Sequence, residues 1–330
     1  MTKNSKVVAY QESLASTART MLAARPEVMQ LPFATHASHD HFLAFLKENP
    51  QINALILGAQ RVGPLEVPAA PGLQVVARIG VGYDMIDIPS LAPRRIPLMT
   101  AGTANSPSVA EEAFHLIFSL IKRGREHDKL VREGRWQTRM SDMPGDIFGK
   151  TMVVVGFGRI GSRVVRRALA MEMAVHVYDP YVSPADIKAA GATPVARLED
   201  ALPMADVLTL HCPRTPETIG LINAARLALL KPTALLINTA RGGIVEEAAL
   251  FDALQRGRIA GAGLDVLEQE PPPVDHPLFK LPNVVFAPHM AGVTREALDR
   301  MSIVSVENVL SVFDGRPIVG NVINKDVLRV

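Results

Sequence analysis

Short runs of β-branched and aliphatic residues alternate with helical stretches along the 330-residue chain. Strands are expected first near residues 6–10, 52–57, 73–79 and 96–99, with helices near 13–24 and 40–47. Further strands are expected near 151–155, 175–179, 207–210, 234–238, 261–266 and 284–287, with helices near 108–123, 159–171 and 294–314. Strands joined by crossover helices pair in parallel, so the pattern predicts an α/β protein with two doubly wound domains.

Amino-acid composition limits the classes of molecule that this chain is expected to bind. Lys and Arg number 35 against 33 Asp and Glu, so the net charge of +2 lacks the basic excess of a nucleic-acid-binding protein. No apolar stretch approaches the ~20 residues of a membrane-spanning helix. The single cysteine, Cys212, cannot form an internal disulfide, and no long apolar run follows the N-terminal residues. We therefore expect a cytoplasmic protein with a small-molecule partner, bound to neither nucleic acid nor membrane.

A glycine motif follows directly on the strand expected at 151–155. Gly156, Gly158 and Gly161 form the pattern GxGxxG where this strand turns into a helix. The first glycine permits a tight turn, the second lets the backbone approach a pyrophosphate, and the third lets the helix pack closely on its strand. The helix N-terminus supplies N–H groups for the phosphates. Taken alone, the glycines also fit a flexible turn.

The next strand ends at Asp179, where a carboxylate can bind the ribose 2′-OH of a dinucleotide. Lys and Arg are absent between Pro180 and Ile187, so nothing there would bind a 2′-phosphate. Asp179 also fits a simple turn before Pro180. Together with the glycine motif, it predicts a dinucleotide site that favours NAD over NADP.

Polar residues follow three later strands, and ligands collect beyond the carboxyl ends of parallel strands. Arg241 lies in a glycine-rich loop and can grip a carboxylate with two parallel hydrogen bonds, or can tie down its own loop. Two carboxylates, Glu268 and Glu270, stand just before three prolines that stiffen the backbone. His289 ends the last strand, and an imidazole close to a carboxylate makes a general acid for carbonyl reduction.

Segments 155–161, 238–243, 263–271 and 288–292, in this order, resemble the D-isomer-specific 2-hydroxyacid dehydrogenases. The likeness covers about residues 50–323. Residues 78–87 resemble the family's substrate-loop motif. Residues 108–111 look like the start of its interdomain helix, with Ser108 as N-cap and Glu111 completing a capping box.

The resemblance implies roles for individual residues. Arg241 would hold the substrate carboxylate and carbonyl oxygen, His289 would transfer the proton, and Glu270 would hydrogen-bond His289 and favour its charged form. The backbone N–H groups of Val81 and Gly82 would bind the substrate carboxylate, and Glu268 is expected to be solvated. The cofactor side would comprise Gly156, Gly158, Arg159, Ile160, Gly161, Asp179, Cys212, Thr239, Ala240, Arg241, Asp265, His289 and Gly292.

The resemblance also implies an architecture. A Rossmann NAD-binding domain, residues 104–294, would be inserted into a flavodoxin-like substrate domain made of residues 1–103 and 295–330. The family usually forms homodimers through the cofactor domain, and the polar segment around Trp136 to Met143 would contribute. The expected reaction interconverts a D-2-hydroxy acid and its 2-keto acid with NAD. Formate dehydrogenases of this fold have glutamine where this chain has Glu270, which disfavours that activity.

Several alternatives stay open. Phosphoglycerate dehydrogenases carry a phosphate-binding arginine after the third strand, whereas this chain has Gly58 there and Arg61 three residues later. Substrates such as 3-phosphoglycerate, glyoxylate, hydroxypyruvate or a bulkier 2-keto acid therefore remain open. A non-catalytic NADH-sensing protein of the same fold is a second alternative. His36, His39 and His41 fit either a metal site or a polar loop that caps the next helix, and we expect no metal.

Overall fold

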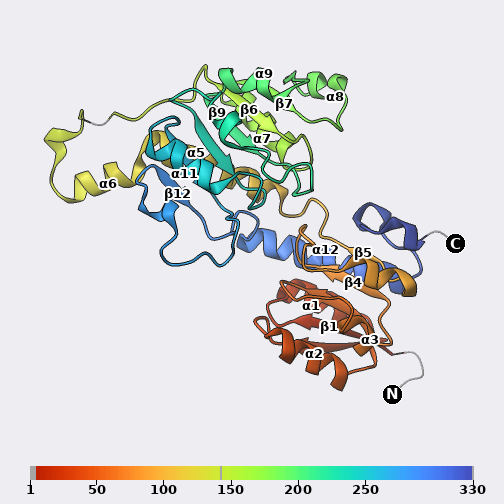
Figure 1. Cartoon of the computed structure of the whole chain (residues 1–330). Helices are drawn as coiled ribbons and strands as arrows, with labels where there is room; N and C mark the ends of the chain where they lie inside the picture. Colours follow the sequence, from red (N-terminus) through yellow and green to blue (C-terminus); the bar gives the residue numbers. More distant parts are fainter. Residues whose placement is uncertain (1–4, 142, 329–330) are drawn as a thin grey trace. The chain divides into compact units, whose positions relative to one another are not determined.

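The computed structural model describes residues 5–141 and 143–328, which form two compact units (Figure 1). The first unit combines the residues up to Asn105 with those from Gly292 onward, and the second spans Ser106–Ala291. The division lies two residues after the first expected boundary and three before the second. Residues 104–105 and 292–294, expected in the cofactor domain, therefore belong to the first unit, and Gly292 is separated from the other expected cofactor residues.

The first unit is built on a five-stranded parallel sheet. Its strands are β1 (Lys6–Gln11), β2 (Val28–Phe33), β3 (Ile52–Leu57), β4 (Val75–Arg78) and β5 (Leu98–Met99). The order β2-β1-β3-β4-β5 is that of flavodoxin-like folds. In such sheets ligands bind beyond the carboxyl ends of the strands at the point where the strand order reverses, here between β1 and β3.

Helices cover both faces of this sheet because each face is apolar. Helices α2 (His39–Glu48), α3 (Glu66–Ala69) and α4 (Ile88–Leu91) bury Phe42, Val67 and Leu91 against one face. Helices α1 (Ser16–Ala23) and α12 (Arg295–Phe313) bury Leu22 and Met301 against the other. Thr294 caps α12 at the expected residue, since its hydroxyl accepts a hydrogen bond from the N–H of Ala297 at 3.0 Å.

Strand β2 was not expected from the sequence. It contains Pro32, and a proline usually argues against a strand because it cannot donate to the ladder. The structure places β2 at an edge of the sheet, where it pairs only with β1. An edge strand needs half of its backbone groups for pairing, so the proline is tolerated.

The second unit contains a seven-stranded parallel sheet. Its strands are β6 (Thr151–Val155), β7 (Ala174–Tyr178), β8 (Thr193–Pro194), β9 (Val207–Leu210), β10 (Leu235–Asn238), β11 (Gly261–Leu264) and β12 (Val284–Phe286). The order β12-β11-β10-β9-β6-β7-β8 is that of a Rossmann sheet with one added strand. The strand order reverses between β6 and β9, where a dinucleotide binds in such folds.

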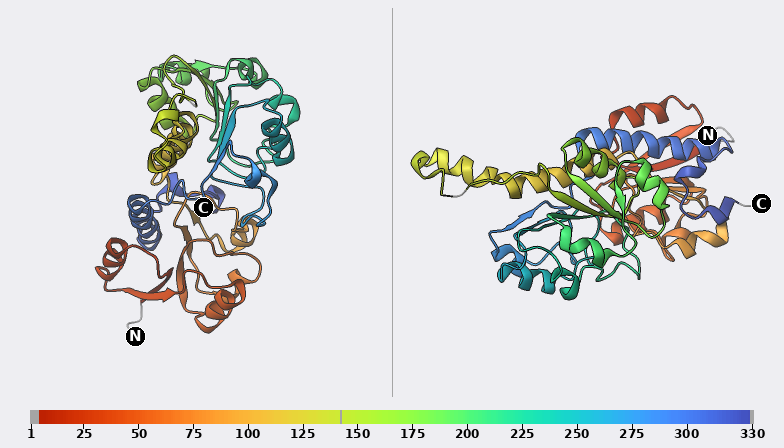
Figure 2. Two further views of the ribbon diagram at one scale, coloured as in Figure 1. Left: turned by 90° about the vertical axis from the view of Figure 1, so that its left-hand side faces the viewer. Right: turned by 90° about the horizontal axis from the view of Figure 1, so that it is seen from above.

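Helices cover both faces of the seven-stranded sheet, as the left view of Figure 2 shows, and a separate apolar core lies on each face. One contains α5 (Ser106–Lys122), α7 (Gly161–Ala170) and α8 (Pro184–Ala189), and the other α9 (Leu198–Ala201), α10 (Ala224–Leu227) and α11 (Glu247–Gln255). The expected capping box at Ser108 is wrong, because α5 begins at Ser106 and Ser108 is buried inside its first turn. Pro107 is accommodated there because the first turn leaves N–H groups unpaired in any case.

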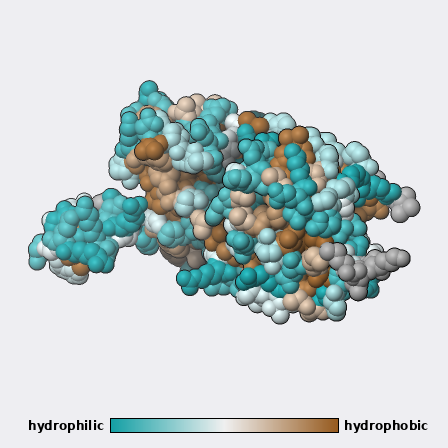
Figure 3. All heavy atoms as spheres, turned by 90° about the horizontal axis from the view of Figure 1, so that it is seen from below, coloured by the Kyte–Doolittle hydropathy of each residue, from teal (hydrophilic) through white to brown (hydrophobic). Residues whose placement is uncertain are grey.

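A helical arm extends from the second unit after α5 (Figures 1 and 2). It contains α6 (Gly124–Arg132) and a short 3₁₀ turn, Trp136–Thr138, where the sequence predicted only a polar segment. Neither element has a buried residue, and the surface of the arm is mostly hydrophilic (Figure 3). Four large apolar side chains are nevertheless more than half exposed on it: Val131, Trp136, Met140 and Met143.

None of the helices in the described parts of the chain combines the length and apolar character needed to cross a membrane. Within residues 5–141 and 143–328, no three His, Cys, Asp or Glu side chains group as metal ligands.

The segment that contains His36, His39 and His41 leads into α2. Ser38 caps this helix by accepting a hydrogen bond from the N–H of His41 at 3.3 Å. This segment is therefore the start of a capped helix.

Candidate active site

The glycine loop follows β6 at the strand-order reversal and packs against the end of β9. A Cβ on Gly156, whose φ is +96°, would lie 2.8 Å from the carbonyl oxygen of His211, and one on Gly161 would lie 1.9 Å from that of Gly156. A Cβ on Gly158 would meet nothing within 4 Å. The outer glycines are thus required by close backbone packing, while the middle one faces open space, as an approaching pyrophosphate requires.

Asp179 stands directly after β7 and is bonded to the same loop. Its Oδ2 accepts a hydrogen bond from the N–H of Phe157 at 2.7 Å, and its Oδ1 accepts one from the N–H of Tyr181 at 2.8 Å. Among the described residues, no acceptor is recorded for the N–H groups of Gly158 and Ile160, next to the N-terminus of α7. These residues fit a dinucleotide, with N–H groups for its phosphates and a carboxylate for its ribose.

Arg241 lies in the loop after β10, and Asn238 shapes this loop. The buried Asn238 accepts a hydrogen bond from the N–H of Ala240 and donates one to the carbonyl of Arg241, both at 3.0 Å. The guanidinium of Arg241 donates to the carbonyl of Ala240 at 2.7 Å. A Cβ on Gly242 would lie 1.9 Å from the carbonyl oxygen of Leu267, so this loop packs directly on the loop after β11.

His289 and Glu270 form a hydrogen-bonded pair at the carboxyl edge of the sheet. Nδ1 of His289 lies 2.6 Å from Oε2 of Glu270, and the other carboxylate oxygen accepts from the N–H of Leu267 at 3.1 Å. Both side chains stay partly exposed, at 48% and 37%. His289 has a left-handed backbone, with φ +55°, which is rare outside glycine and is frequent at functional sites. An imidazole held by a carboxylate is suited to proton transfer.

Asp265, directly after β11, supports the backbone of His289. Its carbonyl accepts from the N–H of His289 at 2.8 Å, and its buried carboxylate accepts from the N–H groups of Met290 and Ala291 at 2.8–3.2 Å. Burial raises the pKa of the Asp265 carboxyl, although these two N–H groups act in the opposite direction. Asp265 therefore fixes the turn that aims the imidazole.

Burial strongly shifts the side-chain pKa values of the two residues that follow β9, His211 and Cys212. Burial raises the pKa of the Cys212 thiol to about 11, so this thiol is protonated at neutral pH and is a poor nucleophile. Burial also lowers the pKa of His211 to about 3. His211 as a residue is half-buried, but its Nδ1 is fully buried and its Nε2 lies 2.9 Å from the hydroxyl of Thr209. After β10, the buried hydroxyl of Thr239 makes no hydrogen bond to a described residue.

The expected site residues thus fall into two groups. Those after β6, β7, β9, β10, β11 and β12 share one edge of the seven-stranded sheet, and β10, β11 and β12 are neighbours in it. Val81 and Gly82 follow β4 in the first unit. Glu268 is exposed, as expected, but it also pairs with Glu247: it accepts from the N–H of Glu247 at 3.2 Å, and its own N–H donates to Glu247 Oε1 at 2.6 Å. The loop geometry that makes this pairing was not visible in the sequence.

The carboxyl edge of the five-stranded sheet offers backbone N–H groups, a neutral amide and one cation, Arg78, which ends β4 and donates from Nε to the carbonyl of Gly82 at 3.0 Å. The described residues provide no recorded acceptor for the N–H groups of Val81 and Gly82. Gln11 ends β1 and Gly58 follows β3, on either side of the strand-order reversal. A Cβ on Gly58 would lie 2.1 Å from Oε1 of Gln11, whose side chain therefore fills the space beside this glycine.

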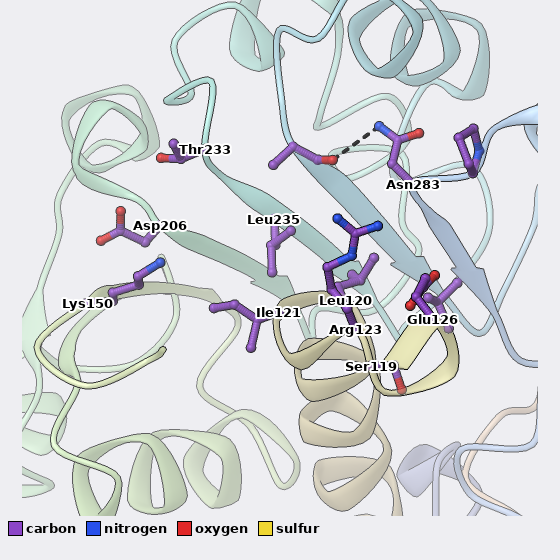
Figure 4. Close-up of a pocket in the computed structure, with 13 residues that line it drawn as sticks. Ser119, Leu120, Ile121, Arg123, Glu126, Lys150, Asp206, Thr233, Leu235 and Asn283 are labelled. Carbon is purple, nitrogen blue, oxygen red and sulfur yellow. Dashed lines mark hydrogen bonds between the residues drawn. The ribbon is translucent and has the colours of Figure 1, made fainter. Parts of the chain in front are cut away.

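A pocket of about 340 Å³ lies at the opposite, amino edge of the seven-stranded sheet (Figure 4). Its lining includes Arg123 and Glu126 from the base of the arm and Lys150 and Asp206, which precede β6 and β9. Asp206 is bonded to the N–H of Thr151 and to Lys231, both at 2.9 Å. None of the expected site residues lines this pocket, so it is separate from the candidate active site.

Sequence reasoning missed two residues that shape the site, Asn238 and Glu247. An asparagine at a strand end followed by a small residue often bonds the backbone two residues on, and this signal could have identified Asn238. Glu247 gave no such signal, because its partners lie 21 and 29 residues away.

The model of the family described as "D-isomer specific 2-hydroxyacid dehydrogenase, NAD binding domain" matches residues 114–291. D-3-phosphoglycerate dehydrogenase of Archaeoglobus fulgidus is 40% identical over 274 residues, which are 83% of this chain and 52% of that protein. Glyoxylate reductase of Korarchaeum cryptofilum is 40% identical over 265 residues, 79% of each chain. The crystal structure of the TT0316 protein from Thermus thermophilus has a TM-score of 0.85 and 34% identity, covering 96% of this chain and 99% of that one.

The fold and the matched segment define a protein with a Rossmann-type NAD-binding domain, which is the second unit. The chain belongs to the D-isomer-specific 2-hydroxyacid dehydrogenase family. It spans between half and three-fifths of the length of the first curated relatives it matches.

Proposed function

We propose that this chain is an NAD-dependent oxidoreductase that interconverts a D-2-hydroxy acid and its 2-keto acid. The observation that carries the proposal is the 2.6 Å contact between His289 and Glu270, at the sheet edge that also bears the glycine loop. The second unit would be the cofactor domain and the first the substrate domain. This assignment agrees with the dehydrogenase and reductase names of the curated relatives.

Three side chains would carry the chemistry. When bound, the nicotinamide accepts or supplies the hydride at the substrate's second carbon. Arg241 would grip the carboxylate and stabilise charge on the carbonyl oxygen. His289 would donate a proton to that oxygen or remove it, and Glu270 would hold the imidazole by its Nδ1 and favour its charged form.

The cofactor would be NAD rather than NADP. Asp179 would bind the ribose hydroxyls and repel a 2′-phosphate, and no Lys or Arg follows it before Ile187. Arg159 and Ile160 would bind the pyrophosphate. Cys212, Thr239, Ala240 and Asp265 would face the nicotinamide, where the buried Thr239 hydroxyl offers a donor or acceptor.

The substrate class would be short 2-keto acids with an uncharged tail. The N–H groups of Val81 and Gly82 would bind the carboxylate. At the same sheet edge, Gln11 fills the space next to Gly58 and presents a neutral amide there, while Arg78 at the end of β4 donates to the carbonyl of Gly82. This favours hydroxypyruvate or glyoxylate over 3-phosphoglycerate, for which the exposed Arg61 would have to supply the positive charge.

The partner would be a second copy of the chain, joined through the cofactor domain. The arm carries Trp136 and Met140 at 56% and 67% exposure, although neither α6 nor the 3₁₀ turn has a buried residue. A nine-residue helix without packing is marginally stable in water, so a partner surface would stabilise it. The expected cytoplasmic location stays a prediction.

A spectrophotometric screen tests the function. Wild-type protein is incubated with NADH and, in turn, hydroxypyruvate, glyoxylate, pyruvate and phenylpyruvate, and D- and L-hydroxy acids are oxidised in parallel. We expect turnover with D stereochemistry, and a loss of about 10²- to 10⁴-fold in His289→Ala. Full turnover in that variant contradicts the assignment. Tight NADH binding without turnover on any substrate favours the NADH-sensing alternative.

A further inference from the structure

The loop that carries Glu270 is held at two points by one carboxylate. Glu247, the first residue of α11, accepts a hydrogen bond from the N–H of Glu268 at 2.6 Å through Oε1. Its Oε2 lies 3.0 Å from Nε2 of His276. The N–H of Glu247 in turn donates to Oε1 of Glu268 at 3.2 Å, which makes the first contact reciprocal. Both ends of the segment 268–276 are therefore bound to the start of one helix.

The anchor at His276 is largely withdrawn from water. The side chains of Glu247 and His276 are only 15% and 13% exposed. The His276 ring packs on Phe279 with 5.3 Å between centroids, and Phe279 meets Phe286 of β12 edge-on at 5.0 Å. A shielded, hydrogen-bonded pair is more rigid than an exposed one and is costly to break from one side. Because β12 leads to His289, Phe279 connects the anchor to the strand that carries the imidazole.

Glu270 lies between these two anchor points. Its carboxylate bonds the N–H of Leu267 with one oxygen and Nδ1 of His289 with the other. It is 37% exposed, so surrounding side chains do not by themselves fix its position. The orientation of Glu270 therefore depends on the backbone that the anchors hold.

We propose that Glu247 is a positioning residue for the acid–base pair: through Glu268 and His276 it holds the loop that aligns Glu270 with His289. This inference rests on the proposed function, because it needs His289 and Glu270 to transfer the proton. Glu247 itself touches neither of them in any recorded contact.

The central test is Glu247→Gln, which keeps the shape of the side chain and removes its charge. We expect kcat for 2-keto acid reduction to fall about 10- to 100-fold, because a catalytic group displaced by about 1 Å loses up to 10²-fold in rate. The dissociation constant for NADH should stay within twofold, since the glycine loop is untouched. The matched control is Glu246→Gln, one residue earlier, where an exposed glutamate makes no side-chain capping bond.

A double-mutant cycle separates positioning from general damage. If Glu247 acts through Glu270, Glu247→Gln should lower kcat less than twofold when Glu270→Gln is already present. An equal loss in both backgrounds overturns the proposal. Unchanged kcat in the single Glu247→Gln variant also overturns it.

The second anchor, the contact of Glu247 with His276, is tested with variants of His276. These variants also test the proposal if Glu247→Gln folds poorly. His276→Gln keeps a donor for Glu247 and should retain kcat within twofold, whereas His276→Leu should lose about tenfold. Equal kcat in the two variants overturns the role of this anchor. Failure of the proposed function looks different: wild-type protein then turns over no 2-keto acid, or His289→Ala stays fully active.

Discussion

The carboxyl edges of the two sheets differ in kind. At the edge of the seven-stranded sheet, strand ends carry charged side chains, two of which bond each other at 2.6 Å. At that of the five-stranded sheet, the strand ends and the loops after them offer backbone N–H groups, the neutral Gln11 and one cation, Arg78, which is bonded to the carbonyl of Gly82. Proton transfer requires titratable groups, whereas an anion can be bound by backbone dipoles alone. The roles proposed above therefore differ between the edges: proton transfer at the first and anion binding at the second.

The largest effect expected from this comparison is on kcat, and it tests which arginine acts on the substrate. Arg241→Ala should lower kcat by about 10²- to 10³-fold with the best 2-keto acid, because a donor to the developing oxyanion is lost. The matched change at the other edge, Arg61→Ala, should alter kcat/KM less than twofold. Steady-state kinetics with both variants checks this. A large loss in Arg61→Ala confined to a phosphorylated substrate would instead support 3-phosphoglycerate chemistry.

The second test compares a glycine from each edge. Gly161→Ala should lower the free energy of unfolding by about 3 kcal/mol, because its Cβ would lie 1.9 Å from a backbone oxygen that cannot move freely. Gly58→Ala should cost less than about 1 kcal/mol, because its Cβ meets the end of the Gln11 side chain, which can change rotamer, rather than backbone. Urea denaturation measures both values. Equal losses would mean that the two loops are packed alike.

The half-buried His211, at the edge of the seven-stranded sheet, predicts an effect of pH on stability. The pKa of His211 is about 3 in the folded chain and about 6.5 when unfolded, so only the unfolded chain gains a proton between these values. Stability is therefore full above pH 6.5 and falls as the pH drops. From pH 7.5 to 5.0, wild type should lose about 2 kcal/mol more than His211→Gln.

The control for this effect is His36→Gln, an exposed histidine of the first unit, which should keep the wild-type pH dependence of unfolding. If wild type and His211→Gln respond equally to acid, His211 is not shielded in solution.

The smallest effect concerns the tail of the substrate. Gln11→Leu should lower kcat/KM for hydroxypyruvate about tenfold, the equivalent of one lost hydrogen bond of ~1.4 kcal/mol. Glyoxylate has no tail and should change less than twofold. Initial rates on the two substrates measure the ratio, and a parallel loss on both would place Gln11 away from the tail.

Much of the candidate site could be predicted because it is local in sequence. The strand, the glycines and Asp179 lie within 29 residues, and each has a conformational requirement that only certain residues meet. The residues after β10 and β12 could be predicted because parallel strands present their carboxyl ends on one edge. By contrast, helix α6 was not predicted. It has no buried face, so its sequence lacks the apolar periodicity that indicates a helix.

By itself, the sequence determined the parallel α/β class and the dinucleotide loop, because short-range periodicity and glycine geometry act within a single strand–helix unit. Only the tertiary structure decided which acid anchors which loop. Glu247 and His276 are 29 residues apart, and their contact depends on how α11 and the loop after β11 pack. In a helix or strand, periodicity fixes which way each side chain points, but in this loop nothing in the sequence does so. The contacts of Glu268 and Glu247 could therefore be found only in the folded structure.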